Sequence, residues 1–246
     1  MIEFGLNSAE RQVAERQGKR SFSQDLAVIP PFSVCVLDRR DASAMNAVGE
    51  LWARVYGSER GLLDLSDIRN AVEDRYHEHS DYIAIYADAQ NEPQAKVMVA
   101  TVRVVRDSRV ELPIERFFAL GPLKRYTHLV EPQRLIVDPA WRRRRFDGAP
   151  YGLSGMLFKA VVKRYLIETL NTTLVIDAFS DSRESPLHAF LQMGAKKFGC
   201  PFHDSELASD TPSIALLCTL LDITTQALSA ERSRFARYLL MNDQGE

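Results

Sequence analysis

One stretch of the chain, residues 131–155, constrains the fold more than any other. It reads EPQRLIVDPAWRRRRFDGAPYGLSG: an apolar strand that begins with an acid, a turn at Asp138-Pro139, four arginines, and glycines at the start of a helix. The first amides of a helix have no partner within the helix and carry partial positive charge. With arginines beside them, such amides favour a bound phosphate. The stretch therefore predicts a strand, a loop and a helix that cradle a phosphate group.

The rest of the chain predicts strands and helices of a single α/β domain. Strand-like apolar runs cover residues 32–37, 82–87, 96–105, 127–137, 173–179 and 213–220. Apolar residues at helical spacing cover residues 42–56, 67–76, 151–170 and 185–193. A turn at Asn91-Glu92-Pro93 predicts an antiparallel hairpin. The connection 106–126 is long and aromatic, which favours a lid or an acceptor pocket.

Length and composition limit the domains and the partners. With 246 residues and 46% hydrophobic content, we expect a flexible extension over residues 1–25, a core domain over 26–225 and a helical tail over 226–246. The 31 Lys+Arg nearly balance the 33 Asp+Glu, so we expect no nucleic acid as a partner. No apolar run approaches the roughly 20 residues that cross a bilayer, so we expect no membrane span. Three cysteines without metal-ligand spacing predict a reducing, cytoplasmic setting.

The order of these elements, together with the 131–155 stretch, resembles the GNAT acyltransferase superfamily over residues 32–220. Val137-Asp138-Pro139 followed by arginines is similar to that superfamily's strand, turn and pyrophosphate loop. Glu131-Pro132-Gln133-Arg134-Leu135 resembles the Glu-x-x-Arg-Leu/Phe strand of the N-acyl amino acid synthases and the acyl-homoserine lactone synthases, and residues 100–105 and 112–117 resemble two further segments of the former. The resemblance implies an α/β (α+β) GNAT fold. Its central sheet is mixed and mostly antiparallel, helices flank it, and a V-shaped cleft opens between the fourth and fifth strands.

Two departures from the ordinary acetyltransferase pattern concern the acyl donor. Arg145 and Gly148 fit Arg-x-x-Gly, but Pro150 has no N–H to offer a pyrophosphate. Phe190 stands where those enzymes have a tyrosine acid. The resemblance to N-acyl amino acid and homoserine lactone synthases implies an acyl carrier protein as donor, because its phosphopantetheine arm carries one phosphodiester. Coenzyme A is the alternative, and we expect neither a permanently bound cofactor nor a metal.

The strand 127–137 carries the candidate catalytic residues. Acylation of an amine by a thioester needs an uncharged nitrogen, so we expect Glu131 to take a proton from the acceptor ammonium, directly or through water. An ion pair with Arg134 or Arg103 is the alternative for Glu131. Arg134 either orients Glu131, which we favour, or binds the carboxylate of an amino-acid acceptor. Arg103 competes for that carboxylate, and Gln133, which faces away from Arg134 in a regular strand, can also reach the substrate.

The donor is expected on the end of that strand and on the loop after it. The resemblance implies that backbone groups of Ile136 and Val137 hold the thioester carbonyl. The loop is expected to contribute Arg142, Arg143, Arg144, Arg145, Phe146, Gly148 and Gly152. Its arginines also suit docking of an acidic carrier protein. A solvated turn and a nucleic-acid patch are the alternatives, and Trp141 and Phe146 are loop anchors in the first of them.

Three further segments leave their roles open. Apolar residues of 112–118, with Phe179 and Phe190, are candidate walls of an acyl tunnel, and ordinary core packing is the alternative. His77-Glu78-His79 indicates polar surface, because neighbouring helical positions point apart. The apolar face of 230–240 fits packing on the fold, a dimer cap or a partner.

The sequence thus predicts an N-acyltransferase that moves a long acyl chain from an acyl carrier protein, or from acyl-coenzyme A, to the amine of an amino acid or related small molecule. Contact with lipid products follows from that prediction. Conventional acetylation from acetyl-coenzyme A is one alternative. A degenerate domain that binds without catalysis is the other.

Overall fold

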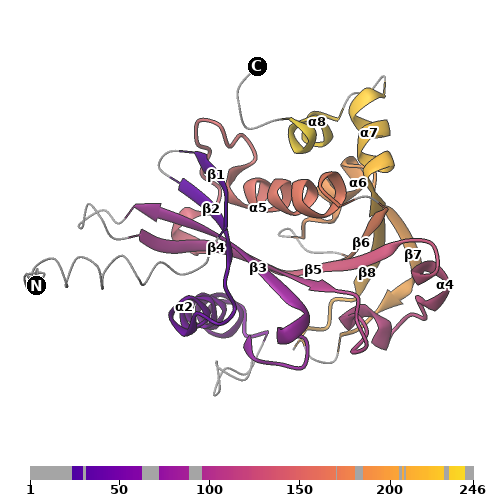
Figure 1. Cartoon of the computed structure of the whole chain (residues 1–246), viewed down its shortest axis with the longest axis horizontal. Coiled ribbons are helices and arrows are strands. Elements are labelled where there is room, and N and C mark those ends of the chain that lie inside the picture. The colour runs from indigo at the N-terminus through magenta and orange to yellow at the C-terminus, as the bar shows by residue number, and fades with distance from the viewer. Residues whose placement is uncertain are drawn as a thin grey trace, which may run out of the picture.

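An eight-stranded sheet runs through the molecule (Figure 1). The computed structural model describes the backbone of residues 24–29, and residues 32–62, 72–88, 96–169, 171–180, 185–204, 207, 209–229 and 233–241 in full. The strands are β1 (Gln24–Ile29), β2 (Phe32–Leu37), β3 (Ser80–Asp88), β4 (Lys96–Arg106), β5 (His128–Val137), β6 (Thr172–Phe179), β7 (Lys196–Phe202) and β8 (Ser213–Thr219). They lie in the order β1-β2-β3-β4-β5-β6-β8-β7. Among them, β5 and β6 form the one parallel pair.

Helices cover both faces of the sheet. The α-helices are α2 (Ala42–Trp52), α4 (Gly121–Lys124), α5 (Gly152–Val162), α6 (Leu187–Gln192), α7 (Leu220–Leu228) and α8 (Arg234–Leu240). Two π-helices, η1 (Ala53–Glu59) and η5 (Lys163–Ile167), extend α2 and α5, and the 3-10 helices are η2 (His77–His79), η3 (Pro113–Arg116) and η4 (Pro139–Trp141). Figure 1 shows α5 and α8 on one side of the sheet and α2 on the other.

Helix α2 shows how the sequence sets these positions. Asp41 caps its start, because the Asp41 carboxylate accepts hydrogen bonds from the amides of Ser43 and Ala44 at 2.9 and 3.2 Å. Its apolar side chains recur at helical spacing and are buried, with Leu51 and Trp52 fully inaccessible. They pack against one face of β2, β3 and β4, while α5 packs against the other face. Both faces of the central strands are therefore apolar.

The parallel pair separates after a short paired stretch. His128, Leu129 and Val130 of β5 pair with residues 172–174 of β6. Beyond Val130 the described residues show no pairing between these two strands, although β5 runs to Val137 and β6 to Phe179. The sheet thus opens into a V between the fourth and fifth of the predicted strands, as the resemblance implies.

The predicted elements are largely confirmed, and the differences have local causes. The sequence does not predict strand β7, because Gly199 and Pro201 interrupt the segment. In the structure this strand is mostly exposed. Helix α7 is likewise not predicted from the sequence, in which no element is expected between the strand 213–220 and the segment 230–240, although Thr219 and Asp222 form a capping box at its start. Strand β1 crosses the boundary expected at residue 25, and the division into three parts stays a prediction. Residues 67–71, half of the helix expected at 67–76, lie outside the described residues.

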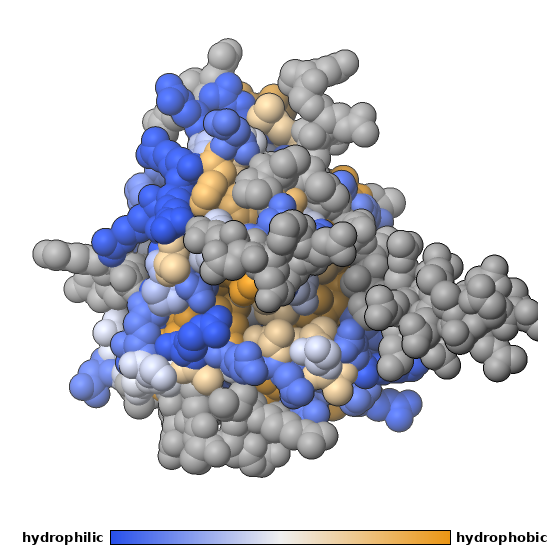
Figure 2. Space-filling model, turned by 90° about the vertical axis from the view of Figure 1, so that its left-hand side faces the viewer, coloured by the Kyte–Doolittle hydropathy of each residue, from blue (hydrophilic) through white to orange (hydrophobic). Residues whose placement is uncertain are grey.

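The surface is mixed in character. On the face shown in Figure 2, apolar surface is visible between hydrophilic side chains. Within the described ranges, the helices are all too short or too polar to cross a bilayer.

Candidate active site

A bulge in the middle of β5 arranges the predicted catalytic strand. Arg103 of β4 pairs with Gln133 and Thr101 pairs with Ile136, so two residues, Arg134 and Leu135, oppose one. Arg134 has φ +50°, in the left-handed region that residues other than glycine rarely adopt, at a strain on the order of 1 kcal/mol. The bulge breaks the alternation of the strand. Gln133 and Arg134 therefore reach the same polar cluster instead of facing opposite sides, which corrects the regular-strand expectation.

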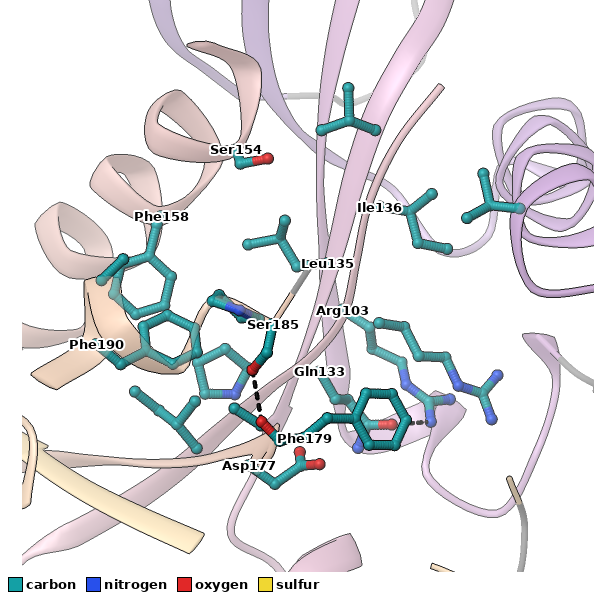
Figure 3. A pocket seen from close by; sticks show the side chains of 18 of the residues that line it. Arg103, Gln133, Leu135, Ile136, Ser154, Phe158, Asp177, Phe179, Ser185 and Phe190 are labelled. Carbon is teal, nitrogen blue, oxygen red and sulfur yellow. Dashed lines mark hydrogen bonds between the residues drawn. The ribbon is translucent and has the colours of Figure 1, made fainter. Parts of the chain in front are cut away.

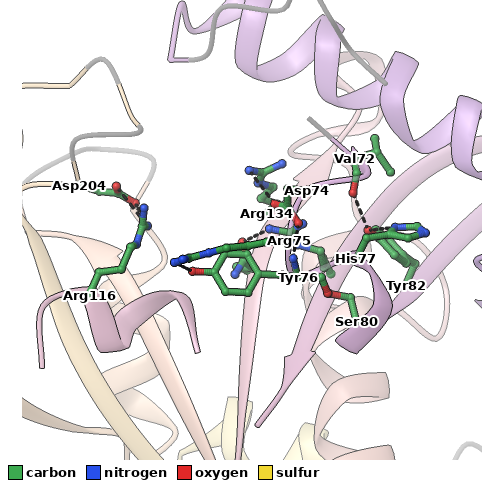
Figure 4. Close-up of polar contacts among 12 residues, drawn as sticks. Val72, Asp74, Arg75, Tyr76, His77, Ser80, Tyr82, Arg116, Arg134 and Asp204 are labelled. Carbon is green, nitrogen blue, oxygen red and sulfur yellow. Dashed lines mark hydrogen bonds and ion pairs between the residues drawn. The ribbon is translucent and has the colours of Figure 1, made fainter. Parts of the chain in front are cut away.

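That cluster, which we call the Asp74 cluster, consists of Asp74, Arg103, Gln133 and Arg134. Figure 3 labels Arg103 and Gln133, and Figure 4 labels Asp74 and Arg134. Arg103 is 1% exposed, and its Nη1 and Nη2 donate to Asp74 Oδ2 and Gln133 Oε1, each at 2.7 Å. Arg134 Nη2 lies 3.8 Å from the same Asp74 oxygen, and its guanidinium stacks 4.5 Å from the centre of the Trp52 ring. The terminal nitrogens of Arg103 are engaged by the protein, so its position favours holding Gln133 and Asp74 over binding an acceptor carboxylate.

Glu131 lies beside this cluster and is 3% exposed. Its Oε2 accepts a hydrogen bond from the amide of Ile114, at the start of η3, at 3.0 Å. This amide orients the carboxyl group, a role that the sequence assigned to Arg134. Burial, and then the charge of Asp177, raise the pKa of Glu131 well above its ordinary value, against the opposing effects of the Ile114 amide, Arg103 and Arg116.

Asp177 of β6 is a second carboxyl group on the same cavity, and the sequence analysis did not identify it (Figure 3). It is partly exposed, and burial together with the neighbouring Asp204 raises its pKa from 3.8 to about 6. The signal in the sequence was a lone acid inside the apolar strand TTLVIDAF. An isolated charge in a buried strand is a candidate functional residue, because its burial is unfavourable without a partner.

Apolar and aromatic side chains divide the cavity into two ends. Phe158 of α5 and Phe190 of α6 pack at 5.0 Å between ring centres, and Leu135 lies near them (Figure 3). Phe179 lies at the other end, on the same strand as Asp177. Phe117, which is 4.4 Å from Phe202, also lines the cavity. The two predicted acyl-wall residues, Phe179 and Phe190, thus belong to different ends of the cavity. We call the end with the Glu131 and Asp177 side chains the carboxyl end, and the 112–118 connection supplies Ile114 and Phe117 to it.

A phenol also lines the cavity, although Phe190 stands at the expected tyrosine position. Tyr56 comes from η1, the π-helix that follows α2. Burial raises the pKa of Tyr56 above 10.0, against the charges of Arg134 and Arg60. Tyr56 is therefore a neutral phenol at physiological pH and can donate a hydrogen bond.

The arginine loop divides into a clamp and an exposed part. Arg142 donates from Nε to the carbonyl of Val137 at 2.8 Å, and both of its terminal nitrogens donate to the carboxylate of Glu59. Arg143, Arg144 and Arg145 are exposed, and all four arginines line the cavity. The guanidinium of Arg144 lies 5.5 Å from the centre of the Trp141 ring. Arg142 thus ties the loop to η1, and the exposed charge belongs to the next three arginines.

The first turn of helix α5 lines the cavity, and no side chain of a described residue caps its amides. Tyr151 at the N-cap makes no side-chain cap, and Leu153 and Ser154 of the first turn line the cavity. The amides of Ala149, in the loop before α5, and of Gly152, its first residue, donate to the carbonyls of Phe146 and Ala149, each at 2.9 Å. These two amides are therefore used internally, while the amides of Leu153 and Ser154, in the first turn beside the cavity, suit an anion.

Gly152 links the loop to α5 in a conformation that glycine favours. Its φ is +64°, and an added Cβ would lie 3.0 Å from the Arg144 carbonyl oxygen. We expect Gly152→Ala to lower the free energy of unfolding by about 1–2 kcal/mol and to raise KM for the acyl donor on the order of tenfold. Gly121→Ala, where an added Cβ meets nothing within 4 Å, is the matched control. Equal donor KM values for the two variants would contradict this role of the junction.

These groups share one cavity of about 780 Å³, within the range of small-molecule sites. The predicted residues that line it are Arg103, Glu131, Gln133, Arg134, Ile136, Val137, Arg142, Arg143, Arg144, Arg145, Gly152, Phe179 and Phe190. Phe146 and Gly148 are not part of the lining. Phe146 instead packs 4.7 Å from Phe32 and 6.2 Å from Trp141, so it anchors the loop.

The histidine pair is used elsewhere. His77 Nδ1 lies 3.0 Å from the hydroxyl of Tyr82, which donates to the carbonyl of Val72 at 3.2 Å (Figure 4). Within the part of the chain that the structure describes, no group of three or more His, Cys, Asp or Glu residues is arranged to hold a metal ion.

Comparisons with known proteins identify a family and a shared fold. The family model for the N-acyl amino acid synthase FeeM matches residues 47–170, half of the chain. The structure of FeeM, an N-acyl amino acid synthase from uncultured soil microbes, is similar with a TM-score of 0.60 and 16% identity, over 82% of this chain and 99% of that chain. NAA60 of Arabidopsis thaliana, in complex with acetyl-CoA, is similar with a TM-score of 0.52 and 12% identity, over 75% of this chain and 97% of that chain. The ribosomal-protein-S5-alanine acetyltransferase of Vibrio fischeri is similar with a TM-score of 0.51 and 10% identity, over 80% of this chain and 96% of that chain.

A comparison with curated proteins finds no match. At these identities the solved structures establish the shared fold, and the family model establishes the family. The predicted GNAT fold, with its mostly antiparallel sheet and flanking helices, is confirmed. The chain belongs to the FeeM family of N-acyl amino acid synthases and is an acyltransferase with the GNAT fold.

Proposed function

We propose that the protein transfers a long acyl chain from the phosphopantetheine thioester of an acyl carrier protein to the amine of an amino acid. The observation that carries this proposal is the division of one cavity into an apolar end and a carboxyl end, with exposed arginines on its lining. A thioester held between the two ends would place its acyl chain against Phe158 and Phe190. Its carbonyl would then face Glu131 and Asp177.

The loop supports a donor with one phosphate over one with a pyrophosphate. Pro150 offers no amide, and the amides of Ala149 and Gly152 are already bonded within the loop. The uncapped first turn of α5 is sufficient for a single phosphodiester. Arg143, Arg144 and Arg145 concentrate positive charge on a chain whose net charge is −2, which suits an acidic carrier protein.

The acceptor belongs at the carboxyl end. An amino acid carries an ammonium, which the Asp177 carboxylate would attract, and a carboxylate, which needs a cation. Arg116 and Arg134 line the same cavity and are candidates for that cation. We therefore propose that Arg134 binds the carboxylate of the acceptor. Arg103 instead holds Asp74 and Gln133 in place. No permanently bound cofactor enters this scheme.

The test is a competition among donors and acceptors. Purified protein is incubated with acyl carrier protein or coenzyme A charged with acyl groups from acetyl to long-chain, together with a mixture of amino acids, and mass spectrometry identifies the N-acyl products. We expect long-chain N-acyl amino acids, formed fastest from the carrier protein. Extraction of the protein as purified should yield the same products or a bound acyl carrier protein.

Other outcomes select the alternatives. Acetylated amines formed from acetyl-coenzyme A alone would indicate a conventional acetyltransferase. Tight binding of a charged donor without turnover would indicate a binding domain. The cytoplasmic setting is part of the proposal, and it accords with Cys35, Cys200 and Cys218 being free thiols.

A further inference from the structure

Two carboxyl groups, those of Glu131 and Asp177, face the cavity from the two strands that separate. Val175 of β6 belongs to the core on the same side of the sheet as Leu129 of β5. Because side chains alternate along a strand, Asp177 lies on the same side as Val175, and Glu131 on the same side as Leu129. Both acids follow the last paired residues, Val130 and Leu174. They therefore approach one space from opposite walls of the V.

The two acids differ in what holds them. Glu131 is 3% exposed, and the Ile114 amide donates to one of its oxygens at 3.0 Å. Asp177 is more exposed than Glu131 and lines the same cavity (Figure 3). A molecule that enters the cavity meets Asp177 more readily than Glu131.

Ionisable groups from several elements interact with Asp177. They are Glu131 on β5, Arg116 on η3, Asp204 after β7 and the neutral phenol of Tyr56 on η1, while Arg103 on β4 interacts with Glu131. Arg116 Nη2 is shared with Asp204, whose oxygens are 3.3 and 3.4 Å away (Figure 4). Arg116 therefore neutralises Asp204 in part.

The two carboxyl groups disfavour each other's ionisation, as paired acids do. The pKa of Glu131 lies well above its ordinary value, chiefly because of burial and then because of Asp177. The pKa of Asp177 is raised to about 6, by burial and by Asp204. Near neutral pH, Asp177, with its pKa of about 6, is thus the largely ionised member of the pair, while the raised pKa of Glu131 favours its protonated form. A base with a pKa just below the working pH is suited to proton transfer.

We propose that Asp177 accepts the proton that the acceptor ammonium loses before attack, and that Glu131 is the buried partner that positions the pair. This assignment rests on the proposed amine acylation. The ammonium gives one proton to the Asp177 carboxylate, which passes it to solvent. The neutral nitrogen then forms a C–N bond to the thioester carbonyl carbon. The C–S bond breaks, the nitrogen loses its second proton, and that proton ends on the departing thiolate, so that an amide, a thiol and one released proton result.

Two acceptors of different basicity test this assignment. An amino acid is an ammonium at neutral pH, whereas an aminooxy acid of similar size has a nitrogen that is already neutral. Asp177→Asn should lower kcat with the amino acid on the order of 100-fold, while kcat with the aminooxy acid stays within a few-fold of the wild type. Glu131→Gln should affect both acceptors alike and by less than tenfold.

The pH dependence gives a second test that needs no inactive variant. Because the Asp177 pKa is about 6 and its ionised form is the base, wild-type kcat/KM for the amino acid should fall as pH drops below about 6. This acidic limb should be absent for the aminooxy acid. In Asp177→Asn, the residual kcat/KM for the amino acid should instead rise with pH through the neutral range and above, because the ammonium must then lose its proton to solvent before attack. The acidic limb should persist in Glu131→Gln.

Several results would overturn the assignment. Equal losses with both acceptors in Asp177→Asn would indicate a structural role, and a selective loss with the ammonium acceptor in Glu131→Gln would make Glu131 the base. Unchanged kcat in Asp177→Asn would remove Asp177 from the mechanism. An active wild type with any of these results leaves the proposed function intact, whereas a wild type that acylates no amine would overturn both.

Discussion

Asp74→Ala should lower the free energy of unfolding by about 3–5 kcal/mol, the largest effect on stability that we expect from a single substitution in this site. Asp74 is the carboxylate that pairs with Arg103, whose side chain is 1% exposed. Without it, the guanidinium of Arg103 stays buried with its charge uncompensated, and Arg134 loses the same oxygen. Urea denaturation measures the change. Because Asp74 also fixes Gln133 through Arg103, kcat should fall as well.

The matched control for Asp74 is Asp88→Ala, at the exposed end of β3, which should change stability by no more than about 0.5 kcal/mol. A double-mutant cycle with Arg103→Met separates the ion pair from other effects. Removing both partners should be less destabilising than the two single changes predict by addition, because no buried charge is left alone. Additive effects, or equal losses in Asp74→Ala and Asp88→Ala, would show that the Asp74 cluster does not stabilise the fold.

Reversing the charge of Arg143, Arg144 and Arg145 to glutamate should raise KM for an acyl carrier protein on the order of 100-fold at low salt. These arginines are exposed and line the cavity, and an acidic carrier protein would meet repulsion in place of attraction. Added salt should shrink the difference between variant and wild type, since surface charges are screened over about 8 Å at physiological ionic strength. Arg142 is left unchanged because it is bound to Glu59.

Two comparisons make this result specific. The triple change of Arg40, Arg109 and Arg125 to glutamate alters net charge equally, at exposed positions that do not line the cavity, and should leave KM for the carrier protein within a few-fold. A short acyl-pantetheine donor, which has no protein surface to dock, should be used equally well by variant and wild type. A loss that is independent of salt, or that extends to the short donor, would argue against electrostatic docking.

Local sequence patterns predicted the parts of this site that follow one another along the chain. The strand with Glu131, the turn at Asp138-Pro139, the arginines and the start of α5 all lie where expected. Residue type, turn chemistry and periodicity act over a few neighbouring residues, so these elements are legible in the sequence. The family resemblance rested on the same local segments, and the family model bears it out over residues 47–170.

Other features of the site depend on contacts between distant segments. The bulge that turns Gln133 and Arg134 to one side arises from the register with β4. Asp74 gave no signal in the sequence, because its importance comes from Arg103, on another element. Phe158 looked like any apolar residue on the inner face of α5, and it is a cavity wall because the strands beneath it separate.

The sequence by itself determined the strands and helices that build the site, the loop that carries positive charge, and the family to which the chain belongs. The tertiary structure decided which side chains meet. Asp177 sits in an apolar strand and becomes a candidate base because β5 and β6 part after Val130 and Leu174 and leave it facing Glu131 across the cavity. Charge interactions of this kind depend on distance and on exclusion of water, and the packed sheet sets both.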